Sequence, residues 1–303
     1  MAFPQSALSM GVEIYVNSAW TDITSDVYSR DKISVNRGRS DEGSTIDPAE
    51  MRLTLDNRSG NYSPRNPSGA YFGQIGRNTK IRYWVKNGQP RLRLGDGQQF
   101  TAADSAGLSI TGDIDMRCDV SLATWRPSAS CYFGALFKGN SYGMYLNYDG
   151  TLTLWWYAGA VFKSLSSTEP VPGATTGRKA VRATLDVNNG AAGHTAAFYY
   201  SNDDTMDGTW VQFGSSVVGS GTTSIDDTTQ TIGTYASGEV CPAELFEARV
   251  YNGIAGTKRA SPKFSAQASG TTSFADAEGN TWSDSAATGA KLDNKHYRFW
   301  GDV

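Results

Sequence analysis

The chain has 303 residues, a formal net charge of -3 and only 19% charged residues, so it lacks the basic footprint of a nucleic-acid-binding protein. We see no apolar run near the length of about 18 residues that membrane insertion needs. Abundant glycine, at 33 residues, and 12% aromatic residues favour an all-β protein with many turns, and the length suggests about two domains. Cys118, Cys131 and Cys241 are odd in number and lack metal-type spacing, so we expect neither a disulfide framework nor a zinc site.

The first 90 residues contain several short stretches with strand-like alternation. In Gly11–Val16, Val12, Ile14 and Val16 share one face. Further extended segments are expected at 22–27, 33–36, 51–55 and 81–85. Residues 1–90 are therefore predicted to form a small antiparallel β-sandwich or barrel, which ends where Lys86–Pro90 interrupts the pattern.

A long loop from Asn57 to Phe72 interrupts this module. Its prolines stiffen the chain and its aromatic side chains favour burial. We interpret it as a docking loop that contacts a neighbouring protein, and the alternative is an ordinary connection packed on its own domain. The predicted assembly contacts are Asn57, Tyr62, Pro64, Arg65, Pro67, Tyr71 and Phe72.

Several separated motifs occur in a specific order here. They are Trp20–Thr24, Arg37–Arg39, Leu53–Asn57, Gly60–Pro67 and Gly76–Thr79. This order resembles the amino-terminal module of minor tail proteins from tailed phages of actinobacteria, a family related in fold to distal tail proteins. The resemblance implies a virion component at the tail tip or baseplate that contacts other tail-tip proteins. The stiff, aromatic 57–72 loop further predicts that the first module forms a closed homo-oligomer. The start of the chain lacks the pattern of a signal peptide, so synthesis in the host cytoplasm is expected.

From about Arg91 the sequence shows regularly spaced short strands, as in a sandwich. The clearest is 181–187, and Asp149-Gly150 is expected to be a hairpin turn between 142–148 and 151–157. Phe137–Asn140, this hairpin, Thr209-Trp210 and Ala248–Ile254 together resemble a laminin-G-type or concanavalin-A-like jelly roll over 93–287. That resemblance implies a lectin-like domain that binds a glycan on the host cell surface.

The carboxyl end is aromatic after a small, polar stretch that we interpret as a linker, Ser283–Gly289. In the tail-protein family, a segment similar to Arg298–Asp302 returns to the first module after a lectin insertion. We therefore predict that the jelly roll is an insertion and that 291–303 completes the 1–90 module. The alternative is an ordered tail that lies on the jelly roll.

The sequence does not predict an enzyme. Glycosidases need two suitably spaced carboxyl groups, but Glu244 and Glu247 are three residues apart and should face opposite sides of a strand. His194 and His296 lie in no nucleophile motif, and His194 is expected in a surface loop.

Alternation predicts that Leu152, Leu154 and Trp156 are core residues and that Trp155 and Tyr157 point the other way. A sheet face that carries such aromatic rings suits a glycan, because sugar C–H faces stack on them. The alternative is that neighbouring loops cover these rings. The predicted glycan-binding residues are Tyr145, Asn147, Trp155, Tyr157, Arg182, Asp186 and Arg249.

Asp203, Asp204 and Asp207 form an acidic loop that could hold a structural calcium ion, although a solvated turn is the alternative. No other cofactor is expected. The predicted function is thus a minor tail protein with a lectin-like domain. The alternatives are a free-standing or secreted carbohydrate-binding module and a glycan depolymerase.

Overall fold

The computed structural model describes residues 10–28, 31–38, 47–95, 99–203, 205–237, 240–284 and 291–302. Over these residues the protein is all-β and antiparallel, which confirms the predicted fold class. The described helices are single turns of 3-10 type: η1 (Thr24–Asp26), η2 (Ala106–Leu108) and η3 (Phe264–Ala266). No described helix has the length and apolar character to cross a membrane.

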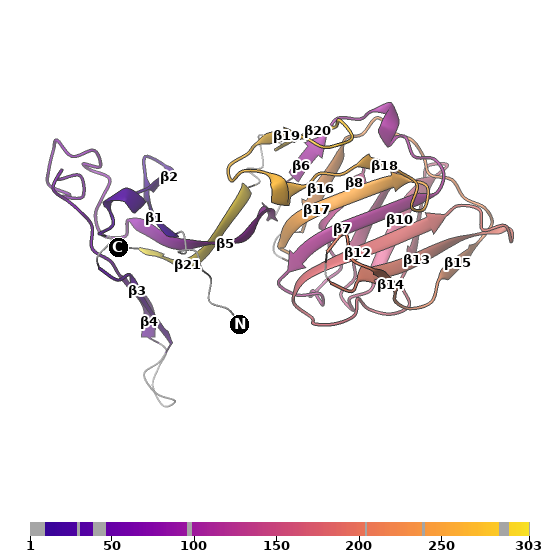
Figure 1. The fold of residues 1–303 in the computed structure, drawn as a ribbon, viewed down its shortest axis with the longest axis horizontal. Helices are drawn as coiled ribbons and strands as arrows, with labels where there is room; N and C mark the ends of the chain where they lie inside the picture. The colour runs from indigo at the N-terminus through magenta and orange to yellow at the C-terminus, as the bar shows by residue number, and fades with distance from the viewer. Residues whose placement is uncertain are drawn as a thin grey trace. The chain divides into compact units, whose positions relative to one another are not determined.

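The chain divides into two compact units, drawn in Figure 1. The first combines Met1–Gly88 with Asn294–Val303, and the second is Gln89–Asp293. The chain enters the second unit within strand β5 (Lys80–Leu94) and leaves it within β21 (Lys291–Asp302), and these two strands pair. The second unit is therefore a continuous stretch within the sequence of the first.

In the first unit, β1 (Met10–Val16) pairs with β5 and forms a hairpin with β2 (Ala19–Asp22). The hairpin turn is Asn17-Ser18, with φ angles of 52° and 58°, as a tight two-residue turn requires. β3 (Ser34–Gly38) and β4 (Asp47–Arg52) form a separate pair. The prediction that 22–27 is one extended segment is wrong, because η1 starts at Thr24, whose N–H donates to the Asp22 carboxylate.

A small core holds the first unit together. It contains Val12, Ile14, Val16, Ile23 and Ile81, which supports the alternation predicted for the first strand. The core continues into residues of the 53–75 segment.

The prediction that the strand pattern breaks at Lys86–Pro90 is wrong, because β5 runs through these residues. Residues 81–85 pair with β1 and 92–94 pair with β17, so Pro90 lies between these two ladders. Its missing N–H therefore removes no hydrogen bond from either ladder.

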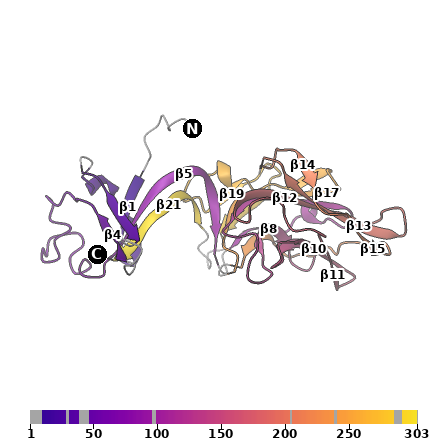
Figure 2. The same cartoon turned by 90° about the horizontal axis from the view of Figure 1, so that it is seen from below.

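The second unit consists of two stacked antiparallel sheets, whose strands form separate layers in Figure 2. In this unit the described part of the large sheet has the order β14-β13-β12-β7-β17-β5, with β15 beside β13 and β18 beside β17. The eight-stranded sheet has the order β11-β10-β9-β8-β16-β6-β20-β19.

The strands of the large sheet not yet given are β7 (Ile114–Leu122), β12 (Gly177–Asp186), β13 (Gly193–Ser201), β14 (Trp210–Gln212), β15 (Val217–Ser220), β17 (Ala243–Asn252) and β18 (Thr257–Ala260). Those of the eight-stranded sheet are β6 (Gln99–Ala102), β8 (Phe133–Lys138), β9 (Tyr142–Leu146), β10 (Leu152–Ala158), β11 (Val161–Ser166), β16 (Ile232–Ala236), β19 (Ser273–Ala275) and β20 (Thr281–Asp284).

The core of the second unit lies between these sheets. Leu152, Leu154 and Trp156 of β10 belong to it, which confirms the predicted inward positions of that strand. The remaining residues of each strand face outward, so each sheet has one outer face. Cys118, Cys131 and Cys241 are buried free thiols.

Candidate functional site

The outer face of the eight-stranded sheet carries a continuous group of aromatic side chains, which we call the aromatic face. Strands β8, β9, β10, β11 and β16 and the segment before β8 supply them. They are Tyr132, Phe137, Tyr145, Trp155, Tyr157, Phe162 and Tyr235.

Glycines on this face make room for the rings. Trp155 pairs across the sheet with Gly143, and Phe137 pairs with Gly233. A Cβ atom on Gly143 would lie 2.4 Å from the Trp155 indole, so the ring occupies the space that a side chain would need. The backbone thus fixes where the indole lies.

The rings form two groups, and within each group neighbouring rings are in contact. In the first, Trp155 stacks with Phe162 at 6.0 Å between centroids and meets Tyr157 edge-on at 6.3 Å. In the second, Tyr132 lies 5.9 Å from Phe137 and 5.5 Å from Tyr235. Such edge and offset contacts hold the rings in fixed orientations.

Exposure differs strongly along the face. Phe162, on the edge strand β11, is 50% exposed, whereas Trp155 is only 5% exposed. Among the described residues, the Trp155 Nε1–H meets no hydrogen-bond acceptor. A buried donor without a partner is uncommon and costs stability, so this indole is a feature that packing alone does not explain.

Other tyrosines on this face affect the pKa of Tyr132. Burial raises the pKa of Tyr132, and the nearby Tyr145, Tyr157 and Tyr235 raise it further. Tyr132 therefore lies near three other tyrosines, and a phenol hydroxyl can both donate and accept a hydrogen bond.

A pocket of about 420 Å³ adjoins the aromatic face at Tyr157, and we call it the edge pocket. Three turns build it: the β8–β9 turn, the β10–β11 turn and the loop before β16. Its lining residues are Asn140, Tyr157, Ala160, Asp226, Asp227 and Thr228.

Only part of the predicted glycan-binding set is brought together. Tyr145, Trp155 and Tyr157 share the aromatic face, as the predicted hairpin register required. Asn147 instead holds the β9–β10 turn, where its Nδ2 donates to the hydroxyls of Thr151 and Thr153, both at 2.8 Å.

The prediction that Arg182, Asp186 and Arg249 share this face is wrong, because they belong to the large sheet. Arg182 donates to the buried Asp115, and Asp186 accepts from the Asn188 N–H in a turn. Arg249 pairs with Glu247. Strand alternation gives the inner or outer side but not the sheet, and this is the source of the error.

The outer face of the large sheet is instead a charge network. Asp115, whose side chain is 0% exposed, accepts from both Arg117 and Arg182 at 2.8 Å. Burial alone would raise the pKa of Asp115, but its hydrogen bonds to Arg117 and Arg182 and their charges outweigh burial and lower it. Arg178 pairs with Asp119 in the same way at 2.7 Å. These ions satisfy one another within the protein.

The sequence argument about Glu244 and Glu247 also needs correction. A β-bulge after Leu245 lets Glu244 pair with Ser121 and Glu247 with Asp119, so both lie on one face. Each carboxylate is nevertheless engaged: Glu244 lies 2.7 Å from Arg91, and Glu247 pairs with Arg249.

His194, expected in a surface loop, is a buried residue of β13. Its Nδ1 lies 2.8 Å from the Gly221 carbonyl oxygen, and its ring packs against Trp156. The position of this histidine is therefore explained by packing. His296 is a residue of β21 whose side chain lies outside the described part.

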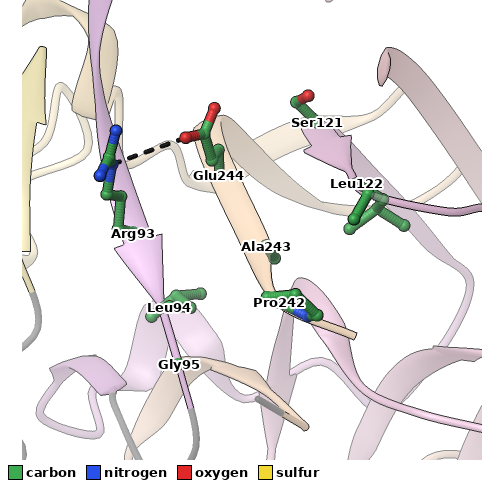
Figure 3. A pocket seen from close by; sticks show the side chains of 9 residues that line it. Arg93, Leu94, Gly95, Ser121, Leu122, Pro242, Ala243 and Glu244 are labelled. Carbon is green, nitrogen blue, oxygen red and sulfur yellow. Dashed lines mark ion pairs between the residues drawn. The ribbon is translucent and has the colours of Figure 1, made fainter. Parts of the chain in front are cut away.

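A second pocket, of about 490 Å³, lies where β17 begins between β5 and β7. Figure 3 shows Leu94, Leu122 and Ala243 lining it, with Arg93 and Glu244 paired at 3.5 Å. Because the apolar lining residues belong to the core and the charged ones pair together, we interpret it as the open end of the core.

Among the described residues, no group of three His, Cys, Asp or Glu side chains that could hold a metal ion occurs, and the calcium site at the acidic loop stays a prediction. Asp203 accepts from Ser201 and from Thr205 within its own turn, and Asp207 pairs with Arg249 at 3.2 Å. Asp204 lies outside the described residues.

The predicted docking loop has two sides. Tyr62 and Tyr71 pack on the small core, and the Tyr62 hydroxyl donates to Asp26 at 2.5 Å. Burial and this hydrogen bond raise the pKa of Tyr62. Asn57 bonds within the loop, accepting from the Tyr62 N–H at 2.9 Å. Asn57 is exposed, and so are Pro64, Arg65, Pro67 and Phe72 of the predicted set.

The loop is ordered by a chain of linked turns. Successive backbone hydrogen bonds join residues 57 to 60, 60 to 63, 63 to 66, 66 to 69 and 69 to 72. The exposed prolines and Phe72 are therefore presented on a defined backbone.

Comparison with protein-family models and with curated proteins finds no match for this chain.

Proposed function

We propose that this chain is a structural minor tail protein of a phage virion, located at the tail tip or baseplate, whose second unit binds a glycan on the host cell surface. The aromatic face is the single observation that carries the glycan part. Its rings are fixed by ring contacts and by Gly143, and Phe162 is half exposed. Preorganised aromatic platforms lose little entropy when they stack on sugar C–H groups.

The ordered motifs in the first 80 residues support the virion part of the proposal. The division into units fits it, because Gln89–Asp293 is inserted between the two parts of the first unit. Immunogold electron microscopy of purified particles tests this part, with antibody against the second unit. We expect gold at the tail tip. Gold on the capsid alone, or particles without the protein, would contradict it.

The first unit is proposed to form a homo-oligomer through the exposed side of the 57–72 loop. Phe72 is 49% exposed, and a ring of copies would match the axial symmetry of a tail. Phe72→Glu places a charge on this side and should shift the protein to monomer in light scattering. The control Arg58→Glu lies in the same loop segment, where the side chain forms an ion pair with Asp56 among the residues that the structure describes, and should keep the oligomer.

Binding by one second unit is expected to be weak, because Phe162 is half exposed whereas Trp155 is only 5% exposed, so little of the aromatic face can reach a ligand. Several copies on one particle would raise the overall affinity through effective concentration. The full chain on a glycan array tests this, with monomeric and oligomeric samples compared. Equal apparent affinity for both samples would contradict the avidity argument.

A further inference from the structure

We propose that the edge pocket beside Tyr157 binds a sugar residue that carries no acidic group, and that it is the part of the glycan site that selects by charge. This inference rests on the proposed glycan binding and adds a position and a chemical class to it. The pocket volume of about 420 Å³ falls in the range of roughly 300–1,000 Å³ usual for ligand pockets.

Hydrogen bonds between the turns hold the pocket in shape. The Asp226 carboxylate accepts from the N–H groups of Gly159 at 2.8 Å and Ala160 at 2.6 Å. The Ser141 hydroxyl donates to the Asp226 carbonyl at 2.6 Å, and the Thr228 hydroxyl donates to the Gly139 carbonyl at 2.9 Å. All three turns are thereby connected, so a ligand meets groups that are already in position.

A buried ion cluster fixes the exposed carboxylate. Lys138 is 0% exposed, and its Nζ lies 2.8 Å from Asp104 and 3.0 Å from Asp227. Asp227 keeps 44% of its side chain exposed, so it can accept hydrogen bonds from a ligand. Beside it stand the Asn140 amide, which donates and accepts, and the half-buried Tyr157 ring.

The charge at this place decides the class of ligand. Asp226 and Asp227 both line the pocket, and Asp227 shares the Lys138 ammonium group with Asp104, so among these four side chains three carboxylates face one ammonium charge and negative charge is in excess. A sugar acid brought here would meet this repulsion in a partly desolvated site. A neutral sugar residue with neighbouring hydroxyl groups can instead donate hydrogen bonds to Asp227 while its C–H face lies on Tyr157.

A second observation points to a ligand at this end of the face. Tyr157 packs edge-on against Trp155, the indole whose buried N–H meets no acceptor among the described residues. The ring shared by the face and the pocket thus packs against the indole that carries this buried donor. The same end carries the exposed Phe162, 5.6 Å from Tyr157.

Binding to matched hexasaccharides tests the proposal, measured by calorimetry with the full chain. The probes are the neutral hexamers of glucose, mannose and xylose and the anionic hexamer of galacturonic acid. We expect at least one neutral hexamer to bind, and the galacturonate hexamer to bind at least about tenfold more weakly, the cost of losing one charge-assisted hydrogen bond.

Asn140→Lys is the decisive variant, because Asn140 is exposed and takes no part in the Lys138 ion pairs, although its φ of 52° makes a check of folding necessary. It should raise affinity for the galacturonate hexamer by about tenfold, since it offsets one excess negative charge. The control Asn188→Lys lies in an exposed turn of the large sheet and should leave the affinities for the neutral and the galacturonate hexamers unchanged. Circular dichroism confirms that both variants fold.

The outcomes separate the two proposals. If neutral binding is lost in Phe162→Ala but Asn140→Lys leaves both affinities unchanged, the face binds glycan and the pocket assignment is wrong. If the galacturonate hexamer binds as well as the neutral ones, the charge selection is wrong. If no hexamer binds, the proposed glycan binding fails and this inference fails with it.

Discussion

Trp155 and Phe162 show how two neighbouring aromatic side chains can serve different purposes. Trp155 is 5% exposed and fills space above Gly143, whereas Phe162 is 50% exposed at the edge strand. Trp155→Ala should therefore destabilise the second unit by about 3–5 kcal/mol, as in other aromatic truncations in cores. Phe162→Ala removes a surface ring at small cost and is the cleaner probe of binding.

Asp115 should be the carboxylate on which acid stability depends most directly. It is fully buried between Arg117 and Arg182, so Asp115→Asn leaves two cations without a counter-charge and should cost about 3 kcal/mol in urea unfolding. Asp207→Asn is the matched control. That carboxylate is 78% exposed and pairs with Arg249, so less than about 1 kcal/mol is expected. Equal losses in both variants would contradict this account.

The pH dependence follows from the direction of the Asp115 shift. Its folded pKa is lowered by hydrogen bonds and charge from Arg117 and Arg182, which outweigh burial. The stabilisation is therefore complete above the unfolded pKa of about 3.9 and is lost as pH falls through the folded pKa. Wild type should lose more unfolding free energy than Asp115→Asn between about pH 5 and pH 2. If the unfolding free energies of wild type and Asp115→Asn fall in parallel with pH, another carboxylate is responsible for the loss of stability in acid.

At the scale of elements, the pairing of β9 with β10 fixes the position of Trp155 on the aromatic face, because the indole lies over Gly143. A Cβ on Gly143 would lie 2.4 Å from the Trp155 ring and 2.9 Å from the Phe137 Cβ. Gly143→Ala should displace the indole, cost about 1–3 kcal/mol and shift tryptophan fluorescence. Gly139→Ala is the control, because its nearest neighbour is the flexible Gln230 side chain at 3.4 Å. A wild-type spectrum for Gly143→Ala would contradict the assigned ring position.

Alternation along single strands could be predicted from the sequence, and it placed Tyr145, Trp155 and Tyr157 correctly. Phe162 was missed, although it pairs with Tyr157 across the β10–β11 hairpin and could have been found by extending the same register. The bulge after Leu245 could not be predicted, because it depends on how β17 pairs with β7. The separation of Arg182 from Trp155 is likewise a property of the sheet topology.

The whole molecule is organised by two strands that belong to both units. β5 and β21 pair, so the entry and exit of the inserted second unit lie on neighbouring strands. An insertion of this kind is tolerated when the ends of the guest domain lie close together. The edge pocket could not be predicted from the sequence, because it is built by three turns that lie far apart in the chain.

Deletion of residues 295–303 tests this organisation. The first unit should lose stability because β5 would lose its partner β21 over these residues. The second unit, with its own core, should keep its melting transition in calorimetry. An unchanged transition of the first unit, or loss of the second one, would contradict the assignment of β21.

The central claim is that the aromatic face binds glycan, and Phe162→Ala on a glycan array of the full chain tests it most directly. The matched control is Val161→Ala, the preceding residue of the same edge strand, which is 58% exposed and points to the other side of the sheet. The account predicts that wild type and Val161→Ala bind the same glycans and that Phe162→Ala loses them while keeping its melting temperature. Unchanged binding by Phe162→Ala, or equal loss in both variants, would contradict it.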